Sequence, residues 1–149
     1  MISLRGMELT KIGVVAIVLA SIAVVYALTS VSVHLSSVGT VKALGVGVYW
    51  DNVCSQTVPS IDWGSAEPGA VKNVTVYIRN EGNAPITLSL QTANWNPTNA
   101  TNYISLSWNY GGQTIGPNQV VAVTLSLSIS ADIQGITTFS FDIVIVGSG

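Results

Sequence analysis

Residues 73–91, NVTVYIRNEGNAPITLSLQ, decide the fold class of this chain. Apolar residues at positions 74, 76 and 78 alternate with polar or amphipathic ones, and positions 86, 88 and 90 repeat the pattern. Period-two alternation is typical of a β-strand with one buried and one wet face. Between the two runs, Asn80–Pro85 carries Gly and Pro and predicts a turn. The stretch therefore predicts two strands joined as a hairpin.

Similar alternation recurs on both sides of this hairpin, with turn signals roughly every 8–15 residues. No run is helical enough to supply a crossover between parallel strands, so we expect antiparallel neighbours. We also expect Trp50 and Trp108 to face the core with the apolar residues of their strands. The chain is predicted to be all-β, an Ig-like antiparallel two-sheet sandwich. Its further strands are expected near residues 44–50, 61–63, 104–110, 121–129 and 139–145.

The N-terminus carries an apolar segment. From Ile12 to Val33 the chain has 22 residues without a charged side chain, enough to span a bilayer as one helix. Arg5 and Lys11 precede it, so the positive-inside rule predicts a cytoplasmic N-terminus and an extracytoplasmic remainder.

Two fates of this segment stay open. It is either a retained transmembrane anchor or a signal h-region cleaved near Ala27, because Val25-Tyr26-Ala27 has the small-residue spacing of a cleavage site. The protein is then either held in the cell membrane or secreted. We expect a basic cytoplasmic segment, the membrane segment, a linker and the β-sandwich domain, at residues 1–11, 12–33, 34–40 and 41–149.

The low charge of the chain argues against nucleic-acid binding. Only 8% of the residues are charged and the formal net charge is −2, against roughly 25% charged residues in typical soluble proteins. Beyond the apolar segment the only cations are Lys42, Lys72 and Arg79, which form no basic footprint for nucleic acid.

Catalytic, cofactor and metal sites are not expected. His34, which directly follows the apolar segment, is the only histidine, so neither a two-histidine metal site nor a Ser-His-Asp triad is expected within one chain. Cys54 is the only cysteine. The acids beyond the apolar segment are scattered and lack the D-x-D spacing of a calcium loop. We expect no enzyme and no cofactor.

Two kinds of surface site are predicted. Asn73 and Asn99 begin N-x-[S/T] sequons and are candidate glycosylation sites. Asn94, Trp95 and Asn96 form a loop-like run before Pro97, and an exposed indole between amides is typical of a surface that stacks on a sugar.

Nearly uncharged strands suggest edge pairing as well. The strands expected at 121–129 and 139–146 hold a single charged residue, Asp142, whereas native sheets usually guard their edges with charge. We expect self-association through strand edges, with residues 138–146 or 41–50 as the pairing segment.

Residues 63–90, WGSAEPGAVKNVTVYIRNEGNAPITLSL, resemble a pattern of extracellular Ig-like modules, of camelysin/TasA-type subunits and of archaeal bundling pilins. Arg5-Gly6 is similar to the processing site of archaeal prepilin-type precursors. VGVYWD at 46–51, IDWG at 61–64 and the C-terminal FDIVIVGSG resemble short archaeal surface proteins. These resemblances imply an Ig-like domain. In the filament families, an N-terminal strand of one subunit completes the sandwich of the next subunit.

The sequence thus predicts a non-catalytic cell-surface structural or interaction module, in one form a self-assembling surface or filament subunit. The alternative is a carbohydrate-binding module that uses an exposed loop Trp. Expected partners are the membrane through residues 12–33, a second copy through strand edges, and a cell-surface glycan.

Overall fold

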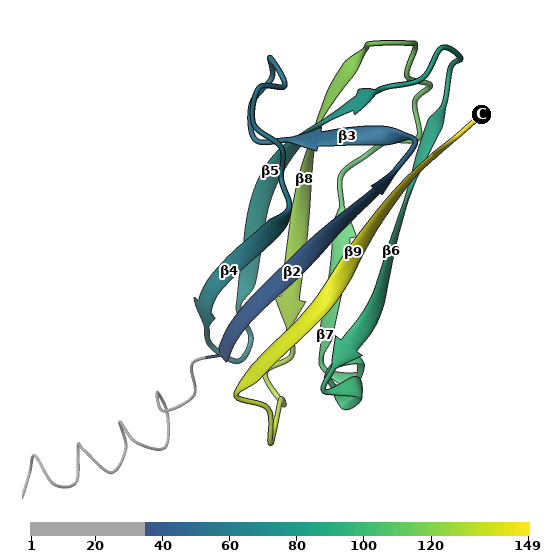
Figure 1. Ribbon diagram of the computed structural model, residues 1–149. Helices are drawn as coiled ribbons and strands as arrows, with labels where there is room; N and C mark the ends of the chain where they lie inside the picture. Colours follow the sequence, from purple (N-terminus) through teal and green to yellow (C-terminus); the bar gives the residue numbers. More distant parts are fainter. Residues whose placement is uncertain (1–34) are drawn as a thin grey trace, which may run out of the picture. The chain divides into compact units, whose positions relative to one another are not determined.

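The computed structural model describes residues 35–149 (Figure 1). The predictions for residues 1–34, including the apolar segment at 12–33, lie outside the described residues. Within residues 35–149 there is no helix with the length and apolar character to cross a membrane.

The described part is a β-sandwich of two four-stranded sheets. The first sheet has the order β4-β2-β9-β6 and the second has the order β3-β5-β8-β7. Figure 1 shows the first sheet in front of the second. The elements in chain order are β2 (Leu35–Leu44), β3 (Val46–Tyr49), β4 (Ser60–Ala66), β5 (Val71–Asn80), β6 (Thr87–Asn96), the 3₁₀ helix η2 (Thr98–Asn102), β7 (Ile104–Trp108), β8 (Val120–Ile129) and β9 (Thr138–Ser148).

The predicted linker at 34–40 is wrong for residues 35–40, which form the first half of β2. Leu35 and Ser37 point inward and are buried while Ser36 and Val38 are exposed, so the strand alternation begins immediately. The inward positions 37 and 39 hold Ser and Gly instead of large apolar residues. The alternation typical of a strand is therefore hard to recognise in the sequence of residues 35–40. At Gly39 a Cβ atom would lie 2.7 Å from Cδ1 of Ile143, so the position has little room for a side chain.

One strand pair departs from the antiparallel expectation. β2 runs parallel to β9, from the pair Ser36/Thr138 to the pair Leu44/Val146, and antiparallel to β4 on its other side. A short connection cannot join parallel neighbours. Here almost the whole domain lies between β2 and β9 in sequence, so no crossover helix is needed.

The chain changes sheets at Gly45, between β2 in the first sheet and β3 in the second. Gly45 has φ +77°, a left-handed conformation that glycine adopts without a steric penalty. The switch places Leu44 and the strand that follows in different sheets, and β3 ends at Tyr49, before Trp50. Val46 and Val48 are buried as expected, but Leu44 is 57% exposed and Trp50 is 39% exposed, which corrects the prediction that Trp50 faces the core.

The segment that predicted a hairpin instead connects the two sheets. β5 belongs to the second sheet and β6 to the first, so Asn80–Pro85 forms an arch over one end of the sandwich. The fully buried Asn80 holds this arch through its side-chain amide. Its Nδ2 donates to Ala84 O at 2.8 Å and to Ile115 O at 2.9 Å, and its Oδ1 accepts from Gly82 N at 2.9 Å.

The core is built from the inward faces of both sheets, as the alternation predicts. Trp63 is buried, and Trp108 lies half-buried against the core with its ring centroid 5.3 Å from that of Tyr110. Ser107 on the opposite face of the same strand is exposed, so the predicted phase of this strand is confirmed. The largest fully buried side chains are Phe141, Leu35, Ile61, Ile78, Ile115, Leu125, Leu127, Ile143 and Ile145.

The expected edge positions of the strands at 121–129 and 139–146 are wrong, whereas the other expected pairing segment, 41–50, includes the outer strand β3. β8 lies between β5 and β7, and β9 lies between β2 and β6, so both have neighbours on each side. Their lack of charge follows from central positions in the sheets. The outer strands are β4 and β6 in the first sheet and β3 and β7 in the second.

Candidate interaction surface

The four outer strands differ in how their edges are protected. β3 has 4 residues and β7 has 5, and short edge strands offer little backbone for pairing. β4 has 7 residues, an exposed acid at Asp62 and a register shift opposite Ser37/Val38, with Gly64 at φ +71°. β6 has 10 residues, TLSLQTANWN, and no ionisable side chain. It is the longest of the four outer strands, and it carries no charge.

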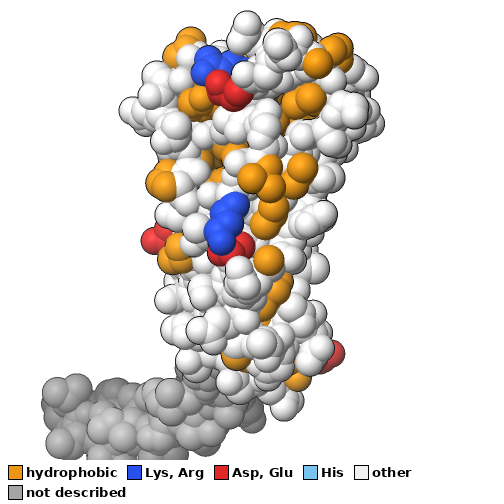
Figure 2. All heavy atoms as spheres, turned by 45° about the vertical axis from the view of Figure 1, so that its right-hand side comes forward, with side chains coloured by type: hydrophobic (Ala, Val, Ile, Leu, Met, Phe, Trp, Pro, Cys, Tyr) orange, Lys and Arg blue, Asp and Glu red, His pale blue; other side chains and the backbone are white. Residues whose placement is uncertain are grey.

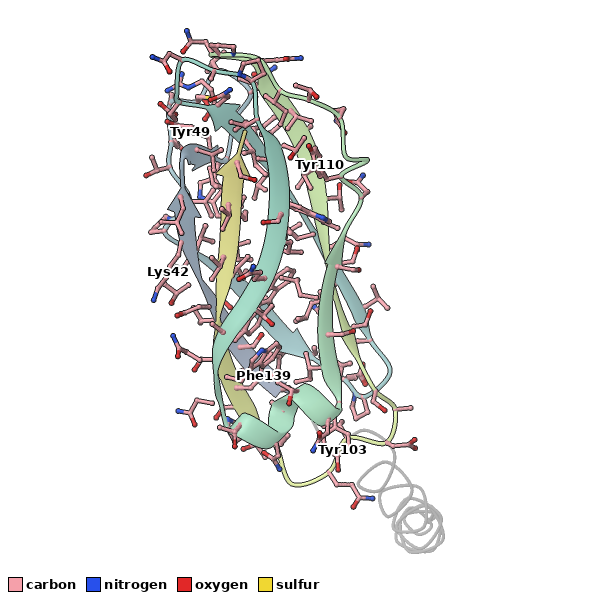
Figure 3. All side chains as sticks on the ribbon, turned by 90° about the vertical axis from the view of Figure 1, so that its right-hand side faces the viewer. Lys42, Tyr49, Tyr103, Tyr110 and Phe139 are labelled. Carbon is pink, nitrogen blue, oxygen red and sulfur yellow. The ribbon has the colours of Figure 1, made fainter. Side chains whose placement is uncertain are left out.

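One end of the β6 edge is covered. Ile86 forms a bridge with Ile115, and the backbone N–H of Leu88 donates to Oη of Tyr110 at 3.2 Å. Figure 3 shows Tyr110 beside this strand. Because the Leu88 N–H bonds Tyr110, it points away from β9, and alternate residues of a strand direct their N–H groups to the same side. The N–H groups of Leu90 and Thr92 therefore point outward too.

A bulge ends the open stretch at its other side. The β6–β9 register shifts between Ala93 and Asn96, and Asn94 adopts φ +53°. Its Nδ2 donates to Oδ2 of Asp142 at 2.7 Å. Hydrogen bonds from Lys42 first and Asn94 second lower the pKa of the Asp142 carboxyl. Bulges of this kind terminate strand pairing, so the open edge comprises residues 89–93.

Trp95 is placed differently from the prediction. It belongs to β6 rather than to a loop, and it lies half-buried against the core. Its ring stacks on Phe141 with centroids 4.1 Å apart and an interplanar angle of 7°, and its Nε1 donates to Oγ1 of Thr92 at 3.0 Å. The stacked face of this indole is not open to a sugar. Of the three predicted residues, Asn94 binds Asp142, Trp95 packs inward, and exposed Asn96 ends the strand.

Both predicted glycan acceptors lie at the surface. Asn73 is exposed on β5, and its Oδ1 accepts a hydrogen bond of 2.6 Å from Oγ of Ser126 on β8. Asn99 is exposed in η2, whose only buried residue is Ala100. Surface placement is what a glycan requires, and the use of either sequon remains a prediction.

The structure adds a polar cluster that the sequence did not reveal, formed by Tyr49, Arg79 and Glu81. Tyr49 Oη donates to Glu81 Oε2 at 2.5 Å, and Arg79 Nε lies 3.0 Å from the same oxygen. The Tyr49 hydrogen bond first and the Arg79 contact second lower the pKa of Glu81, while the bond to Glu81 raises the pKa of Tyr49. Tyr49 and Glu81 are 32 residues apart, so only the β3–β5 pairing brings them together.

The loop after β3 carries Cys54. Asp51 organises this loop, because its Oδ1 accepts the backbone N–H groups of Ser55 at 2.9 Å and Gln56 at 3.1 Å. Cys54 itself adopts φ +59°, and partial burial raises the pKa of its thiol. A raised thiol pKa does not favour the nucleophilic thiolate.

Charge is sparse over the described surface, and Figure 2 shows isolated blue and red groups among white and orange side chains. Within residues 35–149 no three His, Cys, Asp or Glu side chains come together as a metal-binding group. No protein-family model matches the chain, and no curated protein matches it.

Proposed function

We propose that this chain is a non-catalytic, Ig-like cell-surface interaction module that self-associates through the open edge of β6. The observation that carries the proposal is the open stretch at residues 89–93 of β6, an outer strand that has no charge and is paired on one side only. Native sheets usually protect such an edge with charge, proline or a cover. An edge left open over residues 89–93 supports its use in strand pairing.

The proposed occupant is β6 of a second copy, antiparallel to the first. An isologous contact puts the same surface on both sides of a two-fold axis. Residues 89–93, SLQTA, bring no charge to either side, so two copies meet without like-charge repulsion. The outward N–H and C=O groups of Leu90 and Thr92 supply the main-chain hydrogen bonds of strand addition.

The proposed extracytoplasmic location of the domain rests on the N-terminal apolar segment. A 22-residue stretch without charged side chains, preceded by Arg5 and Lys11, supports export of the domain. The domain then stays attached to the membrane or is released after cleavage near Ala27. Low charge and two sequons agree with an extracytoplasmic surface.

The test is sedimentation of a chain that starts at His34, the first residue of the compact unit. Wild type should form dimers as its concentration rises. Leu90→Pro should stay monomeric, because proline removes an outward N–H that β9 does not use. Circular dichroism should show that the variant is folded.

Val144→Lys is the matched control. Val144 lies on the outer face of β9, which has neighbours on both sides, so a lysine there should leave association unchanged. A wild-type chain that stays monomeric at high concentration, or a Leu90→Pro variant that dimerises normally, would show the proposal to be wrong.

A further inference from the structure

A hollow of about 300 Å³ lies on the outer face of the first sheet, at the end where β2 and β9 begin. We call it the polar hollow. Figure 3 shows Phe139 at the end of the sandwich that carries η2. The hollow is lined by Ser36, Ser37, Val38, Asn96, Pro97, Thr138, Phe139 and Ser140.

The strand register explains why these residues meet. Ser36 pairs with Thr138 and Val38 with Ser140 along the parallel β2–β9 ladder, and Asn96 pairs with Ser140 across β6–β9. Ser37 and Phe139 are the buried residues of the lining. Ser36, Thr138 and Ser140 are exposed members of the lining, so their hydroxyl groups are open to solvent.

The bulge at Asn94 shapes one wall. Two residues of β6 oppose one of β9 there, and Trp95 turns inward onto Phe141. Pro97 then leads the chain into η2. Asn96 and Pro97 therefore stand beside the sheet surface as a rim, with a carboxamide and an apolar ring.

The lining selects a class of ligand. None of the eight lining residues is ionisable, so the hollow offers neither the cationic groups that bind anions nor the carboxylates that bind calcium. Hydroxyl and carboxamide groups both donate and accept hydrogen bonds. Val38, which is 43% exposed, and Pro97 add apolar surface. This combination matches a neutral sugar ring. The hydroxyl groups of a sugar exchange hydrogen bonds with hydroxyl and carboxamide groups, and its C–H faces pack on apolar surface.

We infer that the polar hollow binds one unit of a neutral saccharide, independently of strand pairing at β6. Its volume of about 300 Å³ is at the lower end of the range for small-molecule sites. The site replaces the predicted Trp95 platform and keeps one of its three residues, Asn96.

The experiment uses the full-length chain in micelles of a detergent without a sugar headgroup. Saturation-transfer NMR and calorimetric titration are run with the methyl glycosides of glucose, galactose and mannose and with N-acetylglucosamine. Wild type should bind at least one of these sugars. Asn96→Ala should weaken that binding by about fivefold, as expected for one lost hydrogen bond.

Ser140→Trp fills the hollow and should abolish binding. Its control is Ser107→Trp, an exposed strand residue on the second sheet, which should bind like wild type. Circular dichroism confirms folding of each variant. Leu90→Pro should retain sugar binding, which separates this site from the β6 edge. Wild type that binds none of the four sugars, or Ser140→Trp that binds like wild type, overturns the inference.

Discussion

Strands β9 and β6 are neighbours in one sheet, are nearly equal in length, and carry one charge between them, Asp142. β9 is paired along both sides and buries a continuous inward row of aromatic and β-branched residues. β6 is paired along one side and leaves half of its backbone polar groups outside the ladder. The same low charge therefore reflects a central position in β9 and an unguarded edge in β6.

The largest difference between the two strands is expected in the loss of unfolding free energy when an inward-facing ring is removed. Phe141→Ala removes a ring that is 2% exposed, so unfolding free energy should fall by about 3–5 kcal/mol. Trp95→Ala removes a half-buried ring stacked on it and should cost about 1–3 kcal/mol. Urea denaturation of both variants measures the difference. Equal losses would mean that β6 is as deeply embedded as β9, and exposed Gln91→Ala, expected within about 0.5 kcal/mol of wild type, is the control.

Amide hydrogen exchange should show the contrast residue by residue. Every residue of β9 is paired in register with β2 or β6, so central amides such as that of Ile143 should exchange only through global opening. The outward amides of Leu90 and Thr92 should exchange fastest within β6, and that of Leu88, bound to Tyr110, more slowly.

The same exchange measurement, repeated at several protein concentrations, tests pairing between two copies. If β6 pairs with a second copy, protection of Leu90 and Thr92 should rise with protein concentration while that of Ile143 stays constant. Protection of Leu90 at high dilution, equal to that of Ile143, would contradict the open edge.

The smallest expected effect concerns Asp142, whose carboxylate on β9 contacts Lys42 on β2 and Asn94 on β6. The pKa of Asp142 is lowered in the folded chain, by Lys42 first and Asn94 second. Its ionised form therefore contributes stability that is present above the unfolded pKa, about 3.9, and is lost as the pH falls through the lower folded value. Thermal melts at pH 7 and in acid should show a slightly smaller acid loss for Asp142→Asn than for wild type. Glu81, whose pKa is also lowered, should retain part of the acid sensitivity. An unchanged loss would mean that the Lys42 and Asn94 contacts do not persist in solution.

The strand phases follow from local physics. Alternation along residues 73–79 and 121–129 places Val76, Ile78 and Leu125 inward, because a strand turns successive side chains to opposite faces. Three residues escaped the same logic for local reasons. Leu44 is exposed where the chain changes sheets at Gly45, Trp50 is exposed because β3 ends at Tyr49, and the bulge at Asn94 turns Trp95 toward the core.

By itself, the sequence determined the all-β class, the inward faces of most strands and the surface positions of Asn73 and Asn99, since each depends on neighbours within a few residues. Only the tertiary structure decided which strands are central. Edge status depends on whether a second strand, often 100 residues away in sequence as for β2 and β9, supplies hydrogen-bond partners. The same holds for the Tyr49–Glu81 contact and for the polar hollow, whose residues come from three distant segments. An uncharged run looks alike in sequence whether it is covered on both sides or open on one, and the pairing alone distinguishes β9 from β6.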